Sequence, residues 1–175
     1  MAQIKELPQL GFQEALHLAW SKVTQFTGRS RRSEFWWTAL AAFIASFVCN
    51  FIPLLGALAQ FLIMLAMIPI AFRRLHDTGR SGWWYGAAMI ASTVYTAIIS
   101  ASMLSTFMAI ADGNDIAPDE LFKGMAEAFA NPICLVAMLC SFVLGIACLI
   151  FFCMDSKVEP NKYGESPKYV VDNEL

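Results

Sequence analysis

Residues 73–84 read RRLHDTGRSGWW, and the sequence on each side of this charged stretch is apolar. Residues 61–72 contain no charged side chain, and neither do residues 83–111. A charged, glycine-containing segment between two apolar segments of membrane length is typical of a connector at a bilayer surface. If the chain has a functional site, this segment is the first place to look for it.

The composition of the whole chain favours a membrane protein. Hydrophobic residues make up 58% of the sequence and charged residues only 15%, whereas a soluble domain is about half apolar and about a quarter charged. The five cysteines all fall inside apolar runs and none forms a C-x-x-C pair. We therefore predict neither a disulfide framework nor a metal site, and the sequence suggests no cofactor.

The apolar blocks predict an all-α, polytopic membrane protein with four transmembrane helices, over residues 35–52, 54–72, 83–111 and 132–154. A single helix over residues 35–72 would be about 57 Å long, against a hydrocarbon core of about 30 Å. This block should therefore fold back on itself, and Asn50, Pro53 and Gly56 mark the turn. We expect residues 1–175 to form one membrane domain.

The segment before the first block predicts an amphipathic helix over residues 12–27. Phe12, Leu16, Ala19, Trp20 and Val23 recur there at helical spacing. Such a helix fits the membrane interface, with Trp20 near the headgroups. Packing on the protein's own cytosolic loops is the alternative that the sequence leaves open.

The distribution of basic residues predicts the orientation. Eleven of the twelve Lys and Arg residues lie in the N-terminal segment, in residues 73–82 and in the tail at 155–175, and only Lys123 lies between the last two spans. The positive-inside rule then places both termini and residues 73–82 in the cytoplasm. The acidic 112–131 segment lies outside, where residues 118–130 are expected to form a short helix.

Three polar segments should meet on the cytosolic face: GRSRRSEFWW at 28–37, RRLHDTGRSGWW at 73–84 and EPNKYGESPKY at 159–169. Asp77 or Glu34 should lie within salt-bridge reach of an arginine from another segment, because unpaired charges at headgroup depth are costly. The candidates for binding an anion or a partner are Arg29, Arg32, Glu34, Arg73, Arg74, His76, Asp77 and Arg80. The expected interface anchors are Trp36, Trp37, Trp83 and Trp84.

Three interpretations of these residues are open. They could form a structural network of ion pairs, or a site for a phosphate or other anionic group held by arginine. The third is an acid–base pair of His76 and Asp77, for which the sequence supplies no nucleophile or metal.

The same three segments resemble the motifs of a family, the domain of unknown function 805 family of YhaH-like bacterial inner-membrane proteins. Its pattern is close to G-R-x-x-R-x-E-F-W, then R-R-x-H-D-x-G-x-S-G-W-W, then N-x-Y-G-x-x-P. The matching positions are Gly28, Arg29, Arg32, Glu34, Phe35 and Trp36, then Arg73, Arg74, His76, Asp77, Gly79, Ser81, Gly82, Trp83 and Trp84, then Asn161, Tyr163, Gly164 and Pro167. The resemblance runs from about residue 12 to residue 170, and the long acidic 112–131 segment departs from it. It implies a small multi-pass protein of the inner membrane and no established activity.

The leading functional hypothesis is a non-enzymatic protein of the bacterial cytoplasmic membrane. Its cytosolic Arg, His and Asp cluster would bind an anionic lipid headgroup or a protein partner. The alternative is a small transporter or channel that works as an oligomer, followed by a membrane enzyme acting on a lipid phosphate. The expected partners are membrane lipids, a second copy of the chain or another protein, and not nucleic acid. No Asp, Glu, Lys or Arg lies in the middle of a predicted span, which counts against an ion-coupled transporter.

Overall fold

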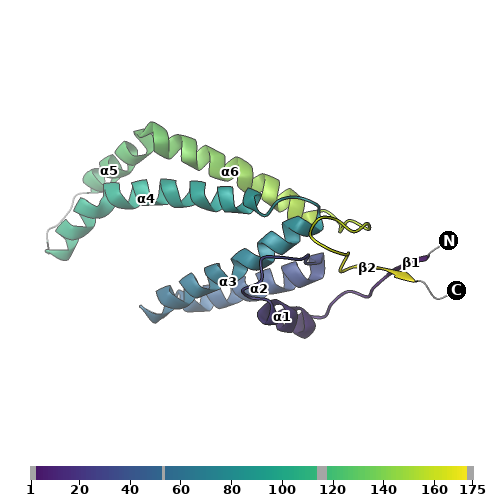
Figure 1. The fold of residues 1–175 in the computed structure, drawn as a ribbon. Helices are drawn as coiled ribbons and strands as arrows, with labels where there is room; N and C mark the ends of the chain where they lie inside the picture. Colours follow the sequence, from purple (N-terminus) through teal and green to yellow (C-terminus); the bar gives the residue numbers. More distant parts are fainter. Residues whose placement is uncertain (1–2, 53, 114–117, 173–175) are drawn as a thin grey trace. The chain divides into compact units, whose positions relative to one another are not determined.

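The computed structural model describes residues 3–52, 54–113 and 118–172, and α-helices account for most of them (Figure 1). The elements in chain order are β1 Gln3–Glu6, α1 Phe12–Ser21, α2 Arg32–Cys49, α3 Leu55–Asp77, α4 Trp83–Ala111, α5 Pro118–Ala130, α6 Pro132–Cys153 and β2 Tyr169–Asp172. The described residues fall into two compact units. The first contains those up to Trp84 and those from Cys148 onward, and the second contains Tyr85–Ala147.

Three of the helices are long and apolar enough to cross a membrane, over Leu55–Asp77, Trp83–Leu104 and Pro132–Cys153. They correspond to the second, third and fourth predicted spans. The first predicted span forms α2, which has 18 residues and carries Arg32 and Glu34 in its first turn. A membrane crossing by α2 therefore stays a prediction. The short helix expected at 118–130 is confirmed as α5.

The helix α3 continues to Asp77, five residues beyond the predicted end at 72. The RRLHD stretch is therefore the last part of a helix and not a loop. It ends in a Schellman motif, in which Arg80 N donates to Leu75 O at 2.9 Å and Gly79 N donates to His76 O at 2.9 Å. Gly79 has a φ of 80°, a conformation that only glycine adopts without strain.

The helix α1 is shorter than predicted and ends at Ser21 instead of residue 27. The chain leaves the helix because the backbone carbonyls of Lys22 and Gln25 accept hydrogen bonds from the Arg73 guanidinium, at 2.6 and 2.7 Å. Those carbonyls turn toward a side chain of another segment, which the local sequence does not reveal.

The all-α prediction missed a small two-stranded sheet. β1 and β2 pair antiparallel, with Ile4 opposite Val171 and Glu6 opposite Tyr169. Figure 1 shows the two strands side by side near the ends of the chain. The sheet pairs the end of the 155–175 segment, predicted to be a cytoplasmic tail, with the N-terminal segment.

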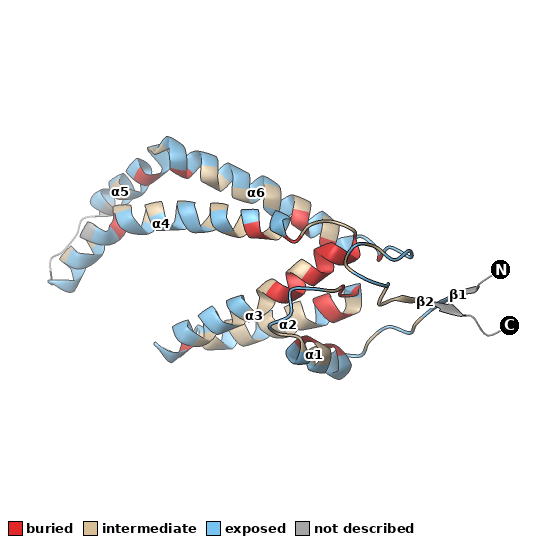
Figure 2. Ribbon diagram, viewed as in Figure 1, coloured by how far each residue is buried: buried red, intermediate tan, exposed pale blue. Residues whose placement is uncertain are grey.

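Buried residues of the first unit gather at the C-terminal end of α3 and the N-terminal end of α2 (Figure 2). The turn between these helices is also tight, because a Cβ at Gly56 would lie 2.0 Å from the carbonyl oxygen of Cys49. In the second unit, α4 and α6 present apolar side chains outward, such as Leu139 and Phe142. Such a surface suits hydrocarbon as its surroundings.

Candidate functional site

Asp77, the last residue of α3, is fully buried and accepts hydrogen bonds from three segments. Its Oδ1 accepts from Arg29 Nε at 3.0 Å, and its Oδ2 accepts from Arg74 Nη1 at 2.5 Å. The hydroxyl of the buried Ser156 also donates to Oδ2. A buried carboxylate is tolerable only when it is paired and hydrogen-bonded, and here two guanidinium groups pair with it and both oxygens accept hydrogen bonds.

The guanidinium groups of Arg29 and Arg74 extend from this carboxylate to the chain that follows α6. Arg29 donates to the carbonyls of Glu159 at 3.0 Å and Gly164 at 3.3 Å, and also to that of Lys157. Arg74 donates to the carbonyl of Phe152 at 3.2 and 3.3 Å and to that of Met154. The planar, five-donor guanidinium suits this task because one side chain can satisfy several carbonyls at fixed angles.

Arg73 links α3 to the N-terminal segment. Its Nη2 lies 3.3 Å from Glu34 Oε1, and both side chains are buried. Its Nη1 donates to the carbonyls of Lys22 and Gln25, and the backbone N of Ser30 donates to the carbonyl of Arg73 at 3.1 Å. Arg73 Nε has no hydrogen-bond partner among the described atoms.

His76 is engaged in structure, and it does not point to the Asp77 carboxylate. Its Nδ1 donates to the Gly28 carbonyl at 3.2 Å. Its ring stacks on Tyr163, with ring centres 3.7 Å apart and planes at 6°, and its own carbonyl accepts from Asn161 Nδ2 at 2.9 Å. The N-x-Y-G element thus packs against the C-terminal end of α3 through Asn161 and Tyr163.

The expected meeting of the three polar segments is confirmed. The ion pairs of Asp77 with Arg29 and of Glu34 with Arg73 join the first two segments, and hydrogen bonds to Glu159 and from Asn161 join the third. We call the buried set Arg29, Glu34, Arg73, Arg74 and Asp77 the ionic cluster. Its guanidinium groups are engaged by protein atoms, which corresponds to the structural interpretation of these five residues.

Arg80 lies beside the cluster with a different role. Its guanidinium sits 4.0 Å from the ring centre of Phe151, a cation–π geometry, and its Nη1 donates weakly to Thr78 O at 3.4 Å. The four expected anchors Trp36, Trp37, Trp83 and Trp84 are all exposed.

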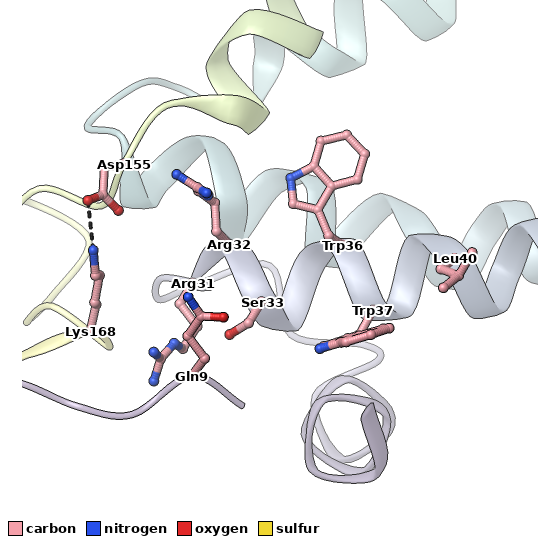
Figure 3. Close-up of a pocket in the computed structure, with 9 residues that line it drawn as sticks. All are labelled: Gln9, Arg31, Arg32, Ser33, Trp36, Trp37, Leu40, Asp155 and Lys168. Carbon is pink, nitrogen blue, oxygen red and sulfur yellow. Dashed lines mark hydrogen bonds and ion pairs between the residues drawn. The ribbon is translucent and has the colours of Figure 1, made fainter. Parts of the chain in front are cut away.

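Arg32 is the exception among the arginines of the first segment. It is exposed, and within the described ranges no acceptor lies within hydrogen-bond distance of it. It lines a pocket of about 470 Å³ (Figure 3) together with Gln9, Arg31, Ser33, Trp36, Trp37, Leu40, Asp155 and Lys168. In Figure 3 the charged residues gather at one end of this pocket, and Trp36, Trp37 and Leu40 follow along α2.

The charged end of the pocket is held by Lys168, whose ammonium lies 2.7 Å from Asp155 Oδ2 and 3.3 Å from Glu6 Oε1. The hydrogen bond from Lys168 holds the pKa of Asp155 below its ordinary value, partial burial opposes this, and the charges of Lys168 and Arg32 add to the lowering. Asp155 is thus a carboxylate at neutral pH.

Sequence reasoning missed four of the residues that shape the site: Gln9, Asp155, Ser156 and Lys168. Long-range contacts bring their segments to the site, among them the pairing of β1 with β2 and the carbonyl contacts of Arg29 and Arg74. Lys168 lies in the 159–169 segment that was expected at this face but was not itself predicted as a site residue. The nearest signal in the sequence was the position of Asp155 and Ser156 directly after the last apolar block.

The apolar helices, with a buried ionic cluster at the N-terminal end of α2 and the C-terminal end of α3, are those of a helical membrane protein. The family described as "Protein of unknown function (DUF805)" matches residues 23–165. This match covers most of the chain and contains the first two polar motifs and the beginning of the third, so the chain belongs to that family.

Two relatives from Escherichia coli strain K12 are similar to part of the chain. Inner membrane protein YhaH is 35% identical over 71 residues, covering 34% of this chain and 59% of the relative. Inner membrane protein YhaI is 39% identical over 67 residues, covering 34% of this chain and 57% of the relative. The chain therefore spans less than two thirds of the length of these relatives. No solved structure matches it.

Proposed function

We propose that this chain is a non-enzymatic integral membrane protein of the bacterial cytoplasmic membrane that holds a phosphate-bearing lipid headgroup at its cytosolic face. The observation that carries the proposal is Arg32, an exposed guanidinium with no acceptor in the described part of the chain, in a pocket that continues into Trp36 and Trp37. A guanidinium binds phosphate through paired N–H donors, and interfacial tryptophan marks headgroup depth.

The proposed arrangement has four transmembrane helices, α2, α3, α4 and α6, with both termini in the cytoplasm and α1 lying at the interface. The inner-membrane location of YhaH and YhaI and the eleven-to-one distribution of basic residues support it. Trp20, which is 77% exposed on α1, would then lie among the headgroups.

In this proposal the ionic cluster has a structural role and does not bind the ligand. Arg29, Arg73 and Arg74 are occupied by carboxylates and carbonyls, so a ligand anion would have to displace buried partners to reach them. Of the basic residues that line the pocket, Arg31 donates to the Leu7 carbonyl and Lys168 pairs with Asp155 and Glu6, which leaves Arg32 as the binding candidate.

The rival functions gain no support from the site. An acid–base mechanism needs convergent groups, and His76 and Asp77 are each committed to different structural partners. A transporter needs a polar path, and the groove along Ala87, Val136 and Cys140 is lined by apolar side chains.

The test is the amount of phospholipid that stays bound to the purified protein, measured by native mass spectrometry. Arg32→Gln should retain roughly tenfold less phospholipid, because losing a charge-assisted contact costs about 1.4 kcal/mol or more. Lys162→Gln is the matched control, since it removes one exposed positive charge of the same face outside the pocket. Equal retention by Arg32→Gln and wild type would overturn the proposal.

A further inference from the structure

The pocket around Arg32 presents charges of both signs, which a purely anionic ligand does not need. One Lys168 ammonium is shared by the two carboxylates Asp155 and Glu6. Asp155 and Glu6 together exceed the Lys168 ammonium by one negative charge, and Arg31 and Arg32 line the same pocket with two positive charges. The arrangement is complementary to a ligand that carries a phosphate and a cation on the same headgroup.

Asp155 has room for a further donor. A carboxylate offers about four acceptor positions, and three donors contact Asp155: Lys168 Nζ at 2.7 Å, Ser156 N at 2.9 Å and Tyr169 Oη at 3.4 Å. Its side chain is 51% exposed. A ligand ammonium can therefore reach it without breaking the contact with Lys168.

Arg32 and Asp155 interact electrostatically but do not form a hydrogen bond with each other. Figure 3 shows their side chains facing the same end of the pocket. Among the described residues no ion pair joins them, so each side chain can contact a different group of one ligand in the pocket that both line.

The opposite end of the pocket suits an acyl chain. Trp36, Trp37 and Leu40 follow Arg32 along α2 and are 40%, 39% and 44% exposed. The line from charged to aromatic to aliphatic side chains along one helix corresponds to the order of groups in a membrane lipid.

We propose that the pocket binds a zwitterionic phospholipid with a primary ammonium, that is, a phosphoethanolamine lipid, with its phosphate on Arg32 and its ammonium on Asp155. This inference rests on the proposed function and adds the class of headgroup. A quaternary ammonium has no N–H to donate, and a glycerol headgroup has no positive charge, so both should bind more weakly.

The experiment titrates the detergent-purified, delipidated full chain with phosphatidylethanolamine, phosphatidylcholine and phosphatidylglycerol of identical acyl chains, with native mass spectrometry as the readout. Wild type should prefer phosphatidylethanolamine by at least about threefold over each of the other two. Asp155→Asn keeps the size of the side chain and the acceptor for Ser156 N, and it should abolish this preference without weakening binding of phosphatidylglycerol.

The variants separate the two proposals. Loss of the preference in Asp155→Asn, together with weaker binding of all three lipids to Arg32→Gln, supports both. An unchanged preference in Asp155→Asn, or no preference in wild type, overturns the headgroup assignment and leaves the proposed function standing. Unchanged binding in Arg32→Gln overturns the proposed function itself. Soluble phosphoethanolamine should compete only weakly, and competition as strong as that of the lipid would overturn the assignment to a lipid.

Discussion

At the scale of single residues, Arg74 shows why the type of positive charge matters. Its three side-chain nitrogens all donate, to the Asp77 carboxylate and to the carbonyls of Phe152 and Met154. A lysine keeps the charge but has one nitrogen, so it cannot reach all three acceptors. We expect Arg74→Lys to lower the melting temperature in detergent clearly, and Arg74→Ala to cost about 3 kcal/mol or more, because a buried pair loses one partner.

The control for this substitution is Arg80→Lys. Arg80 makes one weak hydrogen bond and a cation–π contact with Phe151, and lysine can keep the second of these. Its melting temperature should stay close to that of wild type. If Arg74→Lys also melts like wild type, the planar guanidinium is not what holds α3 to the chain after α6.

The main ion pairs of the ionic cluster could be predicted from the sequence residue by residue. Charges beside apolar segments must find partners, and this argument alone paired Asp77 and Glu34 with arginines of other segments. It could not tell which arginine remains available. The difference between the buried Arg29 and the exposed Arg32 depends on where the backbone carbonyls of residues 157–164 lie, and no local pattern in the sequence places them.

At the scale of elements, the pairing of β1 with β2 and the ion pairs of Lys168 together connect the N-terminal and C-terminal segments. The low pKa of Asp155 means that its contact with Lys168 stabilises the fold above the ordinary pKa of an aspartate. This contribution is lost as the pH falls through the lowered pKa of Asp155. We therefore expect wild type to be more stable than Asp155→Asn at neutral pH, by about 1 kcal/mol or less because the pair is partly exposed.

This difference in melting temperature should shrink as the pH falls below about 4. Thermal unfolding of the two proteins between pH 3 and pH 7 measures this difference. Subtracting one melting temperature from the other removes the contribution of the other acidic groups, because both proteins contain them. A constant difference across that range would mean that the charge of Asp155 does not contribute.

The elements themselves were predictable to different degrees. Helices α4, α5 and α6 follow the sequence pattern to within a residue, because apolar runs with charged or turn-forming ends fix them locally. The strands β1 and β2 were not predictable, since each is four residues long and is stabilised only by a partner more than 160 residues away. The extra turn of α3 falls between these cases, because its charged residues are tolerated in a helix only once Arg29 and the segment around Ser156 supply partners.

At the scale of the whole molecule, the proposed function depends on the orientation of the chain in the membrane. The pocket proposed to hold phospholipid is formed by residues of the first unit at the polar end of α2, together with Gln9, Asp155 and Lys168. The positive-inside rule counts basic residues close to the spans, and the arginines of the ionic cluster contribute to that count although they are buried in the fold. The same arginines would therefore orient the protein during insertion and form the buried ion pairs of the folded protein afterwards.

Cysteine labelling in intact cells tests this orientation. The starting variant has its five native cysteines replaced by serine. One version of it carries a single cysteine in place of Lys123, which is exposed on α5. The other carries a single cysteine in place of Lys162, which is exposed in the N-x-Y-G element. A membrane-impermeant thiol reagent should label the cysteine at 123 from outside and reach the one at 162 only after the cells are opened. Labelling of 162 in closed cells would put the Arg32 pocket on the outer face, and the headgroup site would then face the periplasmic leaflet instead of the cytosolic one.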